Sequence, residues 1–481
     1  MQEAIKPSYD AVVIGTGVGG STFAYGLAQR GLNIAVVETG DFFKPVIPDL
    51  APLHNHYFDF PVIGGQTKSF GAAMYRLREI DFRATEMEAG VSPAWPISYA
   101  DLEPYYARAE VLYKVHGSSV NDPTEPPRSS PWPHAPIPHQ GPVRELVERV
   151  TQRAGMPVAH IPRAIDYAPE AGGKCVLCRR CDAYYCPREA KMDAEVAALR
   201  PAIATGRITV LTNTECLRVL TSSDGRKVSG VQLRSAGREF TVNTGLVSVG
   251  GGLRATPLLL YRSRTDRHPN GLSNGSGALG RYWASHTQAW VFPLAFGVQK
   301  KEFHQKTFAI NAYYERGPGS DRPMGVIQAA GNIEPIGMSR RYRYVADFLL
   351  RHSFQTFVMT EALPTKTSGF ALADDGVKVM GQPAENTRTF RKLHGLAADL
   401  FRAAGYKVFA PKMKSNFHNV GTARMGHDAS DSVVNSDCRS HDVEGLYVVD
   451  STVLPTSGAL NSGLTIAAVA LRAAERAQLN G

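Results

Sequence analysis

Three glycines between an apolar strand and a helix constrain this chain more than any other feature. Gly15, Gly17 and Gly20 follow the apolar-rich stretch 10–14 with the spacing G-x-G-x-x-G, and a helical stretch over residues 21–30 comes next. Gly15 permits a tight turn, Gly17 allows a pyrophosphate to approach the backbone, and Gly20 lets the helix lie against the strand. The pattern predicts a β-α-β unit whose helix N-terminus binds the phosphates of a dinucleotide.

An acidic residue closes this unit. The second apolar run, residues 33–37, ends at Glu38. An acid about 20 residues beyond the last glycine of this motif accepts a hydrogen bond from an adenosine ribose hydroxyl. An acid here also argues against a 2′-phosphate, which leaves NAD or FAD as the dinucleotide.

Length and charge narrow the class of protein. A chain of 481 residues is too long for one ordinary core, so we expect two domains with interleaved segments. With 43% hydrophobic and 20% charged residues, the composition is that of a soluble globular protein. The formal net charge is +9, but Lys and Arg are scattered, so we expect no nucleic-acid partner.

The first residues and the hydropathy pattern predict a location. Residues 1–8 carry no apolar signal region, and no apolar run is long enough to span a bilayer. We therefore expect a cytoplasmic protein without a membrane partner. A disulfide framework is not expected in that compartment, so a cluster of cysteines needs another explanation.

A cysteine run provides such a cluster. Its spacing, C-x2-C-x2-C-x4-C-P, is one residue longer in the last interval than a bacterial iron–sulfur ligand run. Four thiolates could also bind a structural zinc ion, and free thiols or a local disulfide are the third alternative. The candidate ligands are Cys175, Cys178, Cys181 and Cys186.

Strand patterns fill the middle of the chain. Runs between residues 208 and 250 predict a small antiparallel insertion, ending in a strand that runs into Gly250. Alternating runs between about 287 and 380 predict one large, mostly antiparallel sheet, the candidate substrate domain. Residues 388–404 predict a helix that crosses this sheet. The predicted fold class is thus mixed α/β, with a Rossmann-type domain interleaved with a substrate domain.

The last hundred residues are again rich in motifs. His418 lies beside a glycine turn at Gly421, and an apolar strand over 445–449 ends at Asp450. Asn461 opens a helix that continues to about residue 477.

Together these stretches resemble the glucose–methanol–choline oxidoreductase family, whose members bind FAD and oxidise alcohols. The resemblance covers nearly the whole chain. It implies that the small-residue run Gly64–Arg78 passes near the isoalloxazine and that Asp450 meets the ribityl chain. The FAD-binding residues it implies are Gly15, Gly17, Gly20, Glu38, Gly65, Thr67, Gly71, Ala72, Met74, Asp450 and Thr465.

The resemblance is strongest to the branch with pyranose oxidases and bacterial glycoside 3-oxidases. That branch shares G-G-x-T-K-x-x-G-A-A, S-P-A-W-P-I-S-Y and a cysteine run ahead of A-K-x-D-A-E, which here ends at Glu195. His418 matches the family's H-x-x-G-T histidine, and Asn461 matches its asparagine, although Ser462 and Gly463 replace the usual proline and its neighbour. No histidine or cysteine lies within 64–74, so we expect non-covalent FAD.

The resemblance also implies a division of the chain. FAD-binding segments are expected at 1–100, 196–285 and 416–481, the last with the catalytic pair. Residues 101–195 are expected to form a lid or linker with the cysteine run, and residues 286–415 the substrate-binding domain.

The implied reaction is oxidation of a secondary hydroxyl of a sugar or glycoside to a ketone. His418 would take the hydroxyl proton and Asn461 would donate to the same oxygen as hydride moves to flavin N5. Gln355, Thr360 and Glu361, on one predicted inner strand, are the candidates for lining the pocket. The electron acceptor would be O2 or another molecule.

Three alternatives stay open. The first is an FAD dehydrogenase that passes electrons from a sugar or another alcohol through an iron–sulfur cluster to an external acceptor. The second is an NAD-dependent dehydrogenase. The third is a non-catalytic flavoprotein that acts as a binding module, against which the pair His418 and Asn461 argues.

Overall fold

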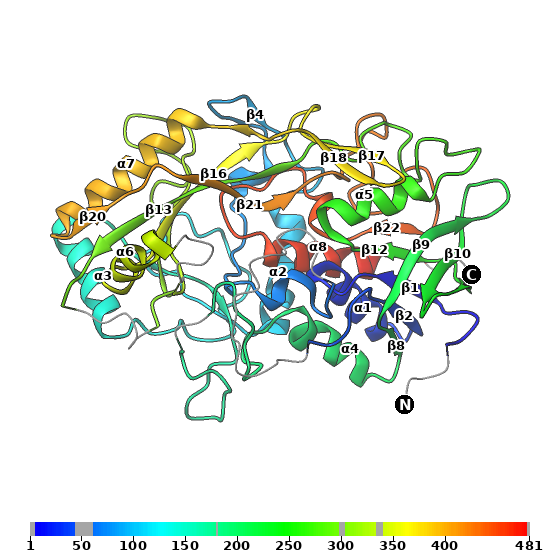
Figure 1. Ribbon diagram of the computed structural model, residues 1–481, viewed down its shortest axis with the longest axis horizontal. Coiled ribbons are helices and arrows are strands. Elements are labelled where there is room, and N and C mark those ends of the chain that lie inside the picture. The colour runs from blue at the N-terminus through cyan, green and yellow to red at the C-terminus, as the bar shows by residue number, and fades with distance from the viewer. Residues whose placement is uncertain (1–4, 44–60, 179–180, 298–303, 333–339, 479–481) are drawn as a thin grey trace.

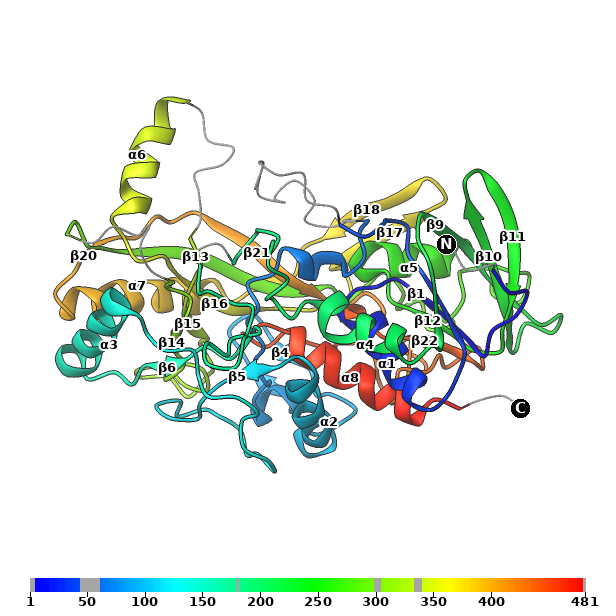
Figure 2. The same cartoon turned by 90° about the horizontal axis from the view of Figure 1, so that it is seen from below.

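The computed structural model describes residues 5–43, 61–178, 181–297, 304–332 and 340–478 (Figure 1). A parallel sheet with its helices and a large antiparallel sheet lie side by side, and both ends of the described chain lie near the parallel sheet (Figures 1 and 2). No helix in these ranges is long and apolar enough to cross a membrane.

The parallel sheet has five strands in the order β22-β12-β1-β2-β8. All of its pairings are parallel, and β1 lies in the centre, where all four of its residues are buried. The predicted β-α-β unit is confirmed as β1, α1 (Val18–Gln29) and β2. The strands are β1 (Ala11–Ile14), β2 (Ile34–Val37), β8 (Ile208–Leu211), β12 (Val247–Val249) and β22 (Leu446–Val448).

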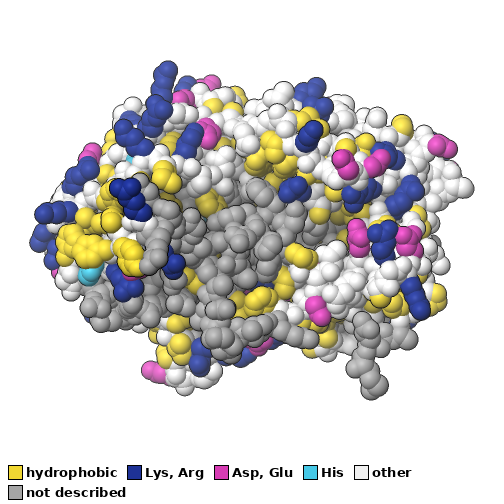
Figure 3. Space-filling view, in the orientation of Figure 1, with side chains coloured by type: hydrophobic (Ala, Val, Ile, Leu, Met, Phe, Trp, Pro, Cys, Tyr) yellow, Lys and Arg dark blue, Asp and Glu magenta, His cyan; other side chains and the backbone are white. Residues whose placement is uncertain are grey.

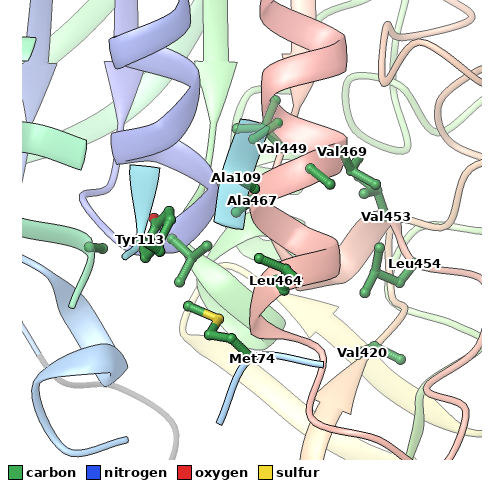
Figure 4. Packing of buried hydrophobic residues seen from close by; sticks show 14 of the residues in the cluster. Met74, Ala109, Tyr113, Val420, Val449, Val453, Leu454, Leu464, Ala467 and Val469 are labelled. Carbon is green, nitrogen blue, oxygen red and sulfur yellow. The ribbon is translucent and has the colours of Figure 1, made fainter. Parts of the chain in front are cut away.

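The helices of this half pack closely on one another. Helices α1 and α8 (Gly463–Arg476) are in contact, and a Cβ added to Gly26 would lie 2.6 Å from Cβ of Ala474. Leu464, Ala467 and Val469 of α8 face buried valines of the 449–453 stretch in Figure 4. Helix α2 (Tyr99–Leu112) lies against α8 as well, so the first and last helical segments share one core.

Other helical segments cover the same half. A π-helical turn, η3 (Glu195–Leu199), leads into α4 (Arg200–Ala204), and both contact α1. Helix α5 follows the glycines after β12. The remaining bounds here are α5 (Gly252–Arg262), η1 (Gly65–Lys68), η2 (Glu79–Phe82) and η5 (Ser451–Val453).

The small antiparallel insertion is confirmed, but it is shorter than predicted. Strands β9 (Thr214–Thr221), β10 (Val228–Ser235) and β11 (Arg238–Asn243) form a three-stranded antiparallel sheet. The strands that flank them, β8 and β12, belong instead to the parallel sheet. Their short apolar patterns fit either sheet, so only the tertiary pairing distinguishes the two.

The large antiparallel sheet is confirmed as eight strands, with the central path β20-β13-β16-β15-β14-β6. Strand β21 pairs with β13, and β19 pairs with β16. The strands are β6 (Ala159–His160), β13 (Ala284–Leu294), β14 (Phe308–Ile310), β15 (Val326–Ala329), β16 (Thr356–Leu363), β19 (Ala384–Glu385), β20 (Lys407–Phe409) and β21 (Lys414–Val420).

Two runs predicted for this sheet lie outside it. Among the described residues, strands β17 (Gly369–Ala373) and β18 (Gly376–Gly381) pair only with each other, apart from a bridge between Arg281 and Gly369. Two further short pairs are β3 (Thr85–Glu86) with β4 (Val91–Ser92) and β5 (Val115–His116) with β7 (Arg163–Ala164).

Helices cover the large sheet. The predicted crossing helix is confirmed as α7 (Thr387–Ala403), which contacts β13 and β16 and buries Phe390, Leu393, Ala397 and Phe401 at helical spacing. Helix α3 (Gly141–Ala154) packs on α7, while α6 (Arg340–Arg351) projects from the body in Figure 2. Lys and Arg side chains are spread over the face in Figure 3, with Asp and Glu among them.

Candidate active site

The turn between β1 and α1 has the geometry of a phosphate-binding turn. Gly15 has a φ of +93°, and a Cβ there would lie 2.3 Å from the carbonyl oxygen of Gly250. A Cβ on Gly20 would lie 2.0 Å from the carbonyl oxygen of Gly15, so the helix sits directly on the turn. A Cβ on Gly17 would meet no described atom within 4 Å. The backbone is therefore open to a ligand at Gly17, at the N-terminus of α1.

Glu38 lies at the carboxyl end of β2, as the motif requires. Its Oε2 accepts hydrogen bonds from the Thr16 amide at 3.1 Å and the Thr16 hydroxyl at 2.6 Å. Its Oε1 accepts from the Thr39 hydroxyl and the Gly40 amide, each at 3.1 Å. These four hydrogen bonds orient the carboxyl group beside the phosphate turn, where a ribose hydroxyl would compete with the donors.

Two further predicted cofactor segments meet the same turn. A Cβ on Gly65 would lie 3.4 Å from Cα of Gly17, and a Cβ on Gly19 would lie 1.9 Å from the carbonyl oxygen of Val449, just before Asp450. Segments 15–20, 64–74 and 445–450, far apart in sequence, therefore share one surface at the start of α1. This close approach of three backbones fits the extended shape of a dinucleotide.

The other predicted cofactor residues of the 64–74 segment are Thr67, Gly71, Ala72 and Met74. Thr67 donates from its hydroxyl to the Gly64 carbonyl at 2.5 Å, and Ala72 adopts a φ of +58°. A Cβ on Gly71 would collide with the carboxylate of Asp182. Met74 is buried at the start of α8, where Figure 4 places it beside Leu464, and its Sδ would lie 3.0 Å from a Cβ on Gly463.

Asp450 and Thr465 both have partners within the protein. Asp450 accepts hydrogen bonds at Oδ2 from the Gly252 amide at 2.6 Å and the Thr256 hydroxyl at 2.5 Å. The hydroxyl of Thr465 lies 2.8 Å from that of Tyr106. These contacts orient Asp450 at the same edge of the sheet as Gly15.

His418 and Asn461 lie in contact. The side-chain amide of Asn461 donates from Nδ2 to Nε2 of His418 across 3.0 Å. Gln328, on β15, donates from Nε2 to Oδ1 of Asn461, also at 3.0 Å. The two residues that the sequence nominates for catalysis are thus adjacent, although 43 positions separate them.

A bulge in β21 aims His418 at this partner. His286 pairs with Phe417 and Ala284 with Val420, so two residues of β21, His418 and Asn419, face one residue of β13. A regular pleat would place His418 on the face opposite Phe417. His418 instead has a φ of +52°, which brings its ring to the side of His286. Backbone strain of this kind is concentrated at functional sites.

The histidine pair is kept neutral. Burial, followed by the effect of His286 and of the Lys306 ammonium, lowers the pKa of His418 from 6.5 to about 3. Burial likewise lowers the pKa of His286 to about 4. His418 remains partly exposed while His286 is fully buried. A neutral imidazole is the form that can accept a proton.

The three predicted pocket residues do not share one environment. Glu361 pairs with His286 across β13 and β16 and therefore lies on the same face of the sheet as that histidine. Thr360, the next residue, points to the opposite face, away from the catalytic pair. Gln355 precedes β16 and is fully buried. Its backbone N–H donates to Oε1 of Gln305 at 3.1 Å.

Glu361 and Asp81 form an acidic pair that no sequence motif indicates. Glu361 accepts a hydrogen bond from Ser92 at 3.1 Å, and it lines a pocket with Asp81, Tyr314 and Gly458. Burial and the charge of Asp81 raise the pKa of Glu361 to about 8. Burial also raises the pKa of Asp81 to about 6. The sequence names Glu361 as a pocket residue, but only the fold brings Asp81 to the same pocket.

The G-G-x-T-K and A-K-x-D-A-E motifs are in contact with each other. The Lys68 ammonium forms an ion pair with Asp193 at 2.9 Å and another with Glu195, all three side chains being buried. Lys191 donates to the carbonyl oxygens of Lys68 and Phe70 and to those of Cys181 and Tyr184. The cysteine loop is thereby attached to the 64–74 segment.

The cysteine run does not form a metal site in this structure. No group of three or more His, Cys, Asp or Glu side chains in the described ranges is arranged to hold a metal ion. The six cysteines of the chain, all within those ranges, form no disulfide. Within the described residues, the structure therefore gives no support to a zinc ion or an iron–sulfur cluster at these cysteines. His116 stacks on His134, and His139 stacks on His160; these histidines are not part of any candidate metal site among the described residues.

Comparisons with known proteins agree with this geometry. Two family models described as GMC oxidoreductase match residues 61–288 and 366–470. The paromamine 6′-oxidase of Streptomyces fradiae is 28% identical over 97% of this chain and 91% of that protein. The 2-methyl-1,2-propanediol dehydrogenase of Mycolicibacterium austroafricanum is 26% identical over 97% of this chain and 94% of that protein.

A solved structure shows the same fold. Pyridoxine 4-oxidase from Mesorbium loti aligns with a TM-score of 0.66 and 16% identity, over 97% of this chain and 98% of that one. The likeness supports the arrangement of the Rossmann-type half and the large sheet.

Proposed function

The chain belongs to the GMC oxidoreductase family, a family of flavoproteins that oxidise alcohol groups, and we propose that it oxidises a secondary hydroxyl of a sugar or glycoside to a ketone. The observation that carries the proposal is the 3.0 Å contact between Nδ2 of Asn461 and Nε2 of His418. A hydrogen-bond donor and a neutral base face the same point, as abstraction of a hydroxyl proton requires.

FAD would be held by the surface at the start of α1. The open backbone at Gly17 and the amides of the first turn of α1 would meet the pyrophosphate, while Glu38 would meet the ribose. Segment 64–74 and Asp450 would lie along the rest of the cofactor. When bound, FAD supplies the acceptor for the hydride that leaves the alcohol carbon.

The protein's own residues would handle the proton. An alcohol that displaces the direct contact between Asn461 and His418 would give its proton to Nε2 of His418 and accept a hydrogen bond from Nδ2 of Asn461. Loss of the proton raises the electron density on oxygen, which makes the neighbouring C–H bond a better hydride donor. His418 can take the proton because its lowered pKa keeps it neutral in the resting enzyme.

The substrate class is supported by likeness. The shared motifs are those of a branch that acts on pyranoses and glycosides, and one relative is named for oxidising paromamine at its 6′ position. Relatives are named both oxidase and dehydrogenase, so O2 and another acceptor are both candidates. We also propose non-covalent FAD, because residues 64–74 include neither histidine nor cysteine.

Anaerobic bleaching of the bound flavin tests the proposal. Free sugars, glycosides and simple alcohols are mixed with the holoenzyme, and the oxidised-flavin absorbance is followed in the wild type and in His418→Asn. We expect glycosides or sugars to bleach the wild type and to leave the variant oxidised. Bleaching of the variant at the wild-type rate would refute the role of His418, and bleaching by simple alcohols alone would refute the substrate class.

A further inference from the structure

A chain of directed hydrogen bonds runs through the catalytic pair and begins at a backbone carbonyl. Nε2 of His286 lies 3.1 Å from the carbonyl oxygen of Ser457. A carbonyl oxygen can only accept, so Nε2 of His286 must carry a proton. His286 is fully buried on β13, which keeps its ring in this orientation.

The next bond follows from the first. A neutral His286 protonated at Nε2 has a bare lone pair at Nδ1. Nδ1 of His418 lies 3.0 Å from that atom, and one of the two nitrogens must donate. His418 therefore carries its proton on Nδ1, and its Nε2 is left unprotonated.

This series of hydrogen bonds is also fixed at its other end, where Gln328 contacts Asn461. Gln328 donates to Oδ1 of Asn461, so the amide Nδ2 of Asn461 is turned toward Nε2 of His418. A donor at this position requires an acceptor on His418, which agrees with the assignment from the Ser457 side. Both ends of the chain thus select the same tautomer of His418.

The surrounding charges leave the pair neutral. Buried side chains around it include the ammonium of Lys306, which pairs with Asp182 at 2.5 Å, and Glu361, which faces His286 from β16. Burial is the main cause that lowers the pKa of both histidines. The pKa of the Glu361 carboxyl is raised to about 8, so this group is uncharged below that pH. A charged histidine pair, in which both Nδ1 atoms would hold protons, is therefore disfavoured.

We propose that His286 is a positioning residue, which accepts the Nδ1 proton of His418 and thereby presents the bare Nε2 of His418 to the substrate hydroxyl. The inference rests on the proposed function, in which His418 is the base. His286 would not touch the substrate. In the other tautomer, Nε2 of His418 would hold a proton, and the ring could not accept one from the alcohol.

Two substitutions separate this role from simple packing. His286→Leu removes the acceptor, while His286→Asn keeps an oxygen near the position of Nδ1. A matched control is His394→Leu, because His394 also contacts a backbone carbonyl of β13, that of Trp290 at 3.0 Å, but does not contact His418. Each variant is prepared as FAD-loaded protein with its bound-flavin spectrum recorded.

The direct readout is the tautomer of His418 by NMR of protein labelled with ¹⁵N in histidine, with His418→Asn used to assign its signals. We expect a protonated Nδ1 and a bare Nε2 in the wild type and in His394→Leu, and loss of this single tautomer in His286→Leu. Flavin reduction at saturating substrate should fall about 100-fold in His286→Leu, with substrate affinity little changed, and should be partly restored in His286→Asn.

The outcomes distinguish the two proposals. An unchanged His418 tautomer in both His286 variants would overturn the inference, whether or not the rates fall. If His418→Asn reduces flavin normally, the proposed function fails, but the tautomer measurement still decides what His286 does. If His286→Leu does not fold, His286→Phe takes its place, because it also lacks an acceptor at the position of Nδ1: loss of the single His418 tautomer there supports the inference, and an unchanged tautomer overturns it.

Discussion

Lys191 donates a hydrogen bond of 2.8 Å from its ammonium group to the carbonyl oxygen of Phe70. The same ammonium lies 2.6 Å from the carbonyl oxygen of Tyr184, in the cysteine loop. Burial lowers the pKa of Lys191, and its ammonium donates to the backbone carbonyls of Lys68, Phe70, Cys181 and Tyr184. One side chain thereby attaches the cysteine loop to the segment that is proposed to meet the flavin.

Lys191→Met should loosen this attachment. Several buried carbonyls would lose their donor, which costs about 1–3 kcal/mol each and is partly offset by removal of a buried charge. We expect the free energy of unfolding to fall by about 2–4 kcal/mol and FAD to dissociate more readily. Thermal unfolding and flavin release on dilution measure both effects.

Lys174→Met serves as the control in the same loop. Lys174 is half exposed and lies 3.8 Å from Glu189, a surface pair of about 0–1 kcal/mol. Equal losses of stability and flavin in the two variants would show that Lys191 has no special role.

His418→Ala and His418→Asn should differ in stability but not in activity. Both remove the proposed base, so flavin reduction should fall by about 10²–10⁴-fold in each, with the bound-FAD spectrum intact. Asn tolerates a positive φ better than Ala, and His418 has a φ of +52°. We therefore expect a higher Tm for His418→Asn. Equal Tm values would mean that the bulge relaxes without cost.

Local backbone geometry explains which parts of the site could be predicted from sequence. The turn at Gly15 and the acid at Glu38 are requirements of one β-α-β unit, so short-range spacing reveals them. His418 and Asn461 belong to motifs that the resemblance supplied. His286 and Gln328 have no such pattern, because they reach the pair only through contacts across 132 and 133 positions.

The same distinction applies to the fold. The strands β8 and β12 could be recognised as strands, but four and three residues do not reveal whether a partner runs parallel or antiparallel. The pocket predicted from Thr360 and Glu361 is likewise divided, because side chains alternate along β16 and these two point to opposite faces of the sheet.

Acid should destabilise the protein through histidines that are buried in neutral form. Burial lowers the pKa of His304, His286 and His418 to between about 3 and 4. In the unfolded chain each would bind a proton near pH 6.5, so the unfolded state binds more protons below that pH and stability rises with pH in this window. Each histidine contributes up to about 1.4 kcal/mol per pH unit.

His304 is the most direct test of this acid dependence. Its Nε2 accepts from Arg163 at 2.9 Å and its Nδ1 lies 2.8 Å from the carbonyl of Cys178, so a second ring proton would break the first bond. His304→Gln should reduce the slope of the unfolding free energy against pH, between pH 4.5 and 6, by about 1.4 kcal/mol per pH unit, which corresponds to one proton. The exposed His427→Gln should leave the slope unchanged, and equal slopes in the three proteins would refute the assignment.

Glu361 should produce the opposite pH dependence. Its pKa is raised to about 8 by burial and by Asp81, so the folded state holds a proton that the unfolded chain loses near pH 4.5. The folded state therefore binds more protons between these values, and this group destabilises the protein as pH rises from about 4.5 to 8. Glu361→Gln should remove that loss.

We expect Glu361→Gln to raise the free energy of unfolding by a few kcal/mol at pH 9 and to change it little at pH 5. Denaturant unfolding at both pH values measures the difference, with the exposed Glu86→Gln as the control. An equal effect at the two pH values would indicate a packing change rather than titration.

Because Glu361 faces His286 on the adjacent strand, its deprotonation would also place a negative charge across from the ring that is proposed to orient His418. Flavin reduction in Glu361→Gln should accordingly lose any pH dependence that the wild type shows near pH 8.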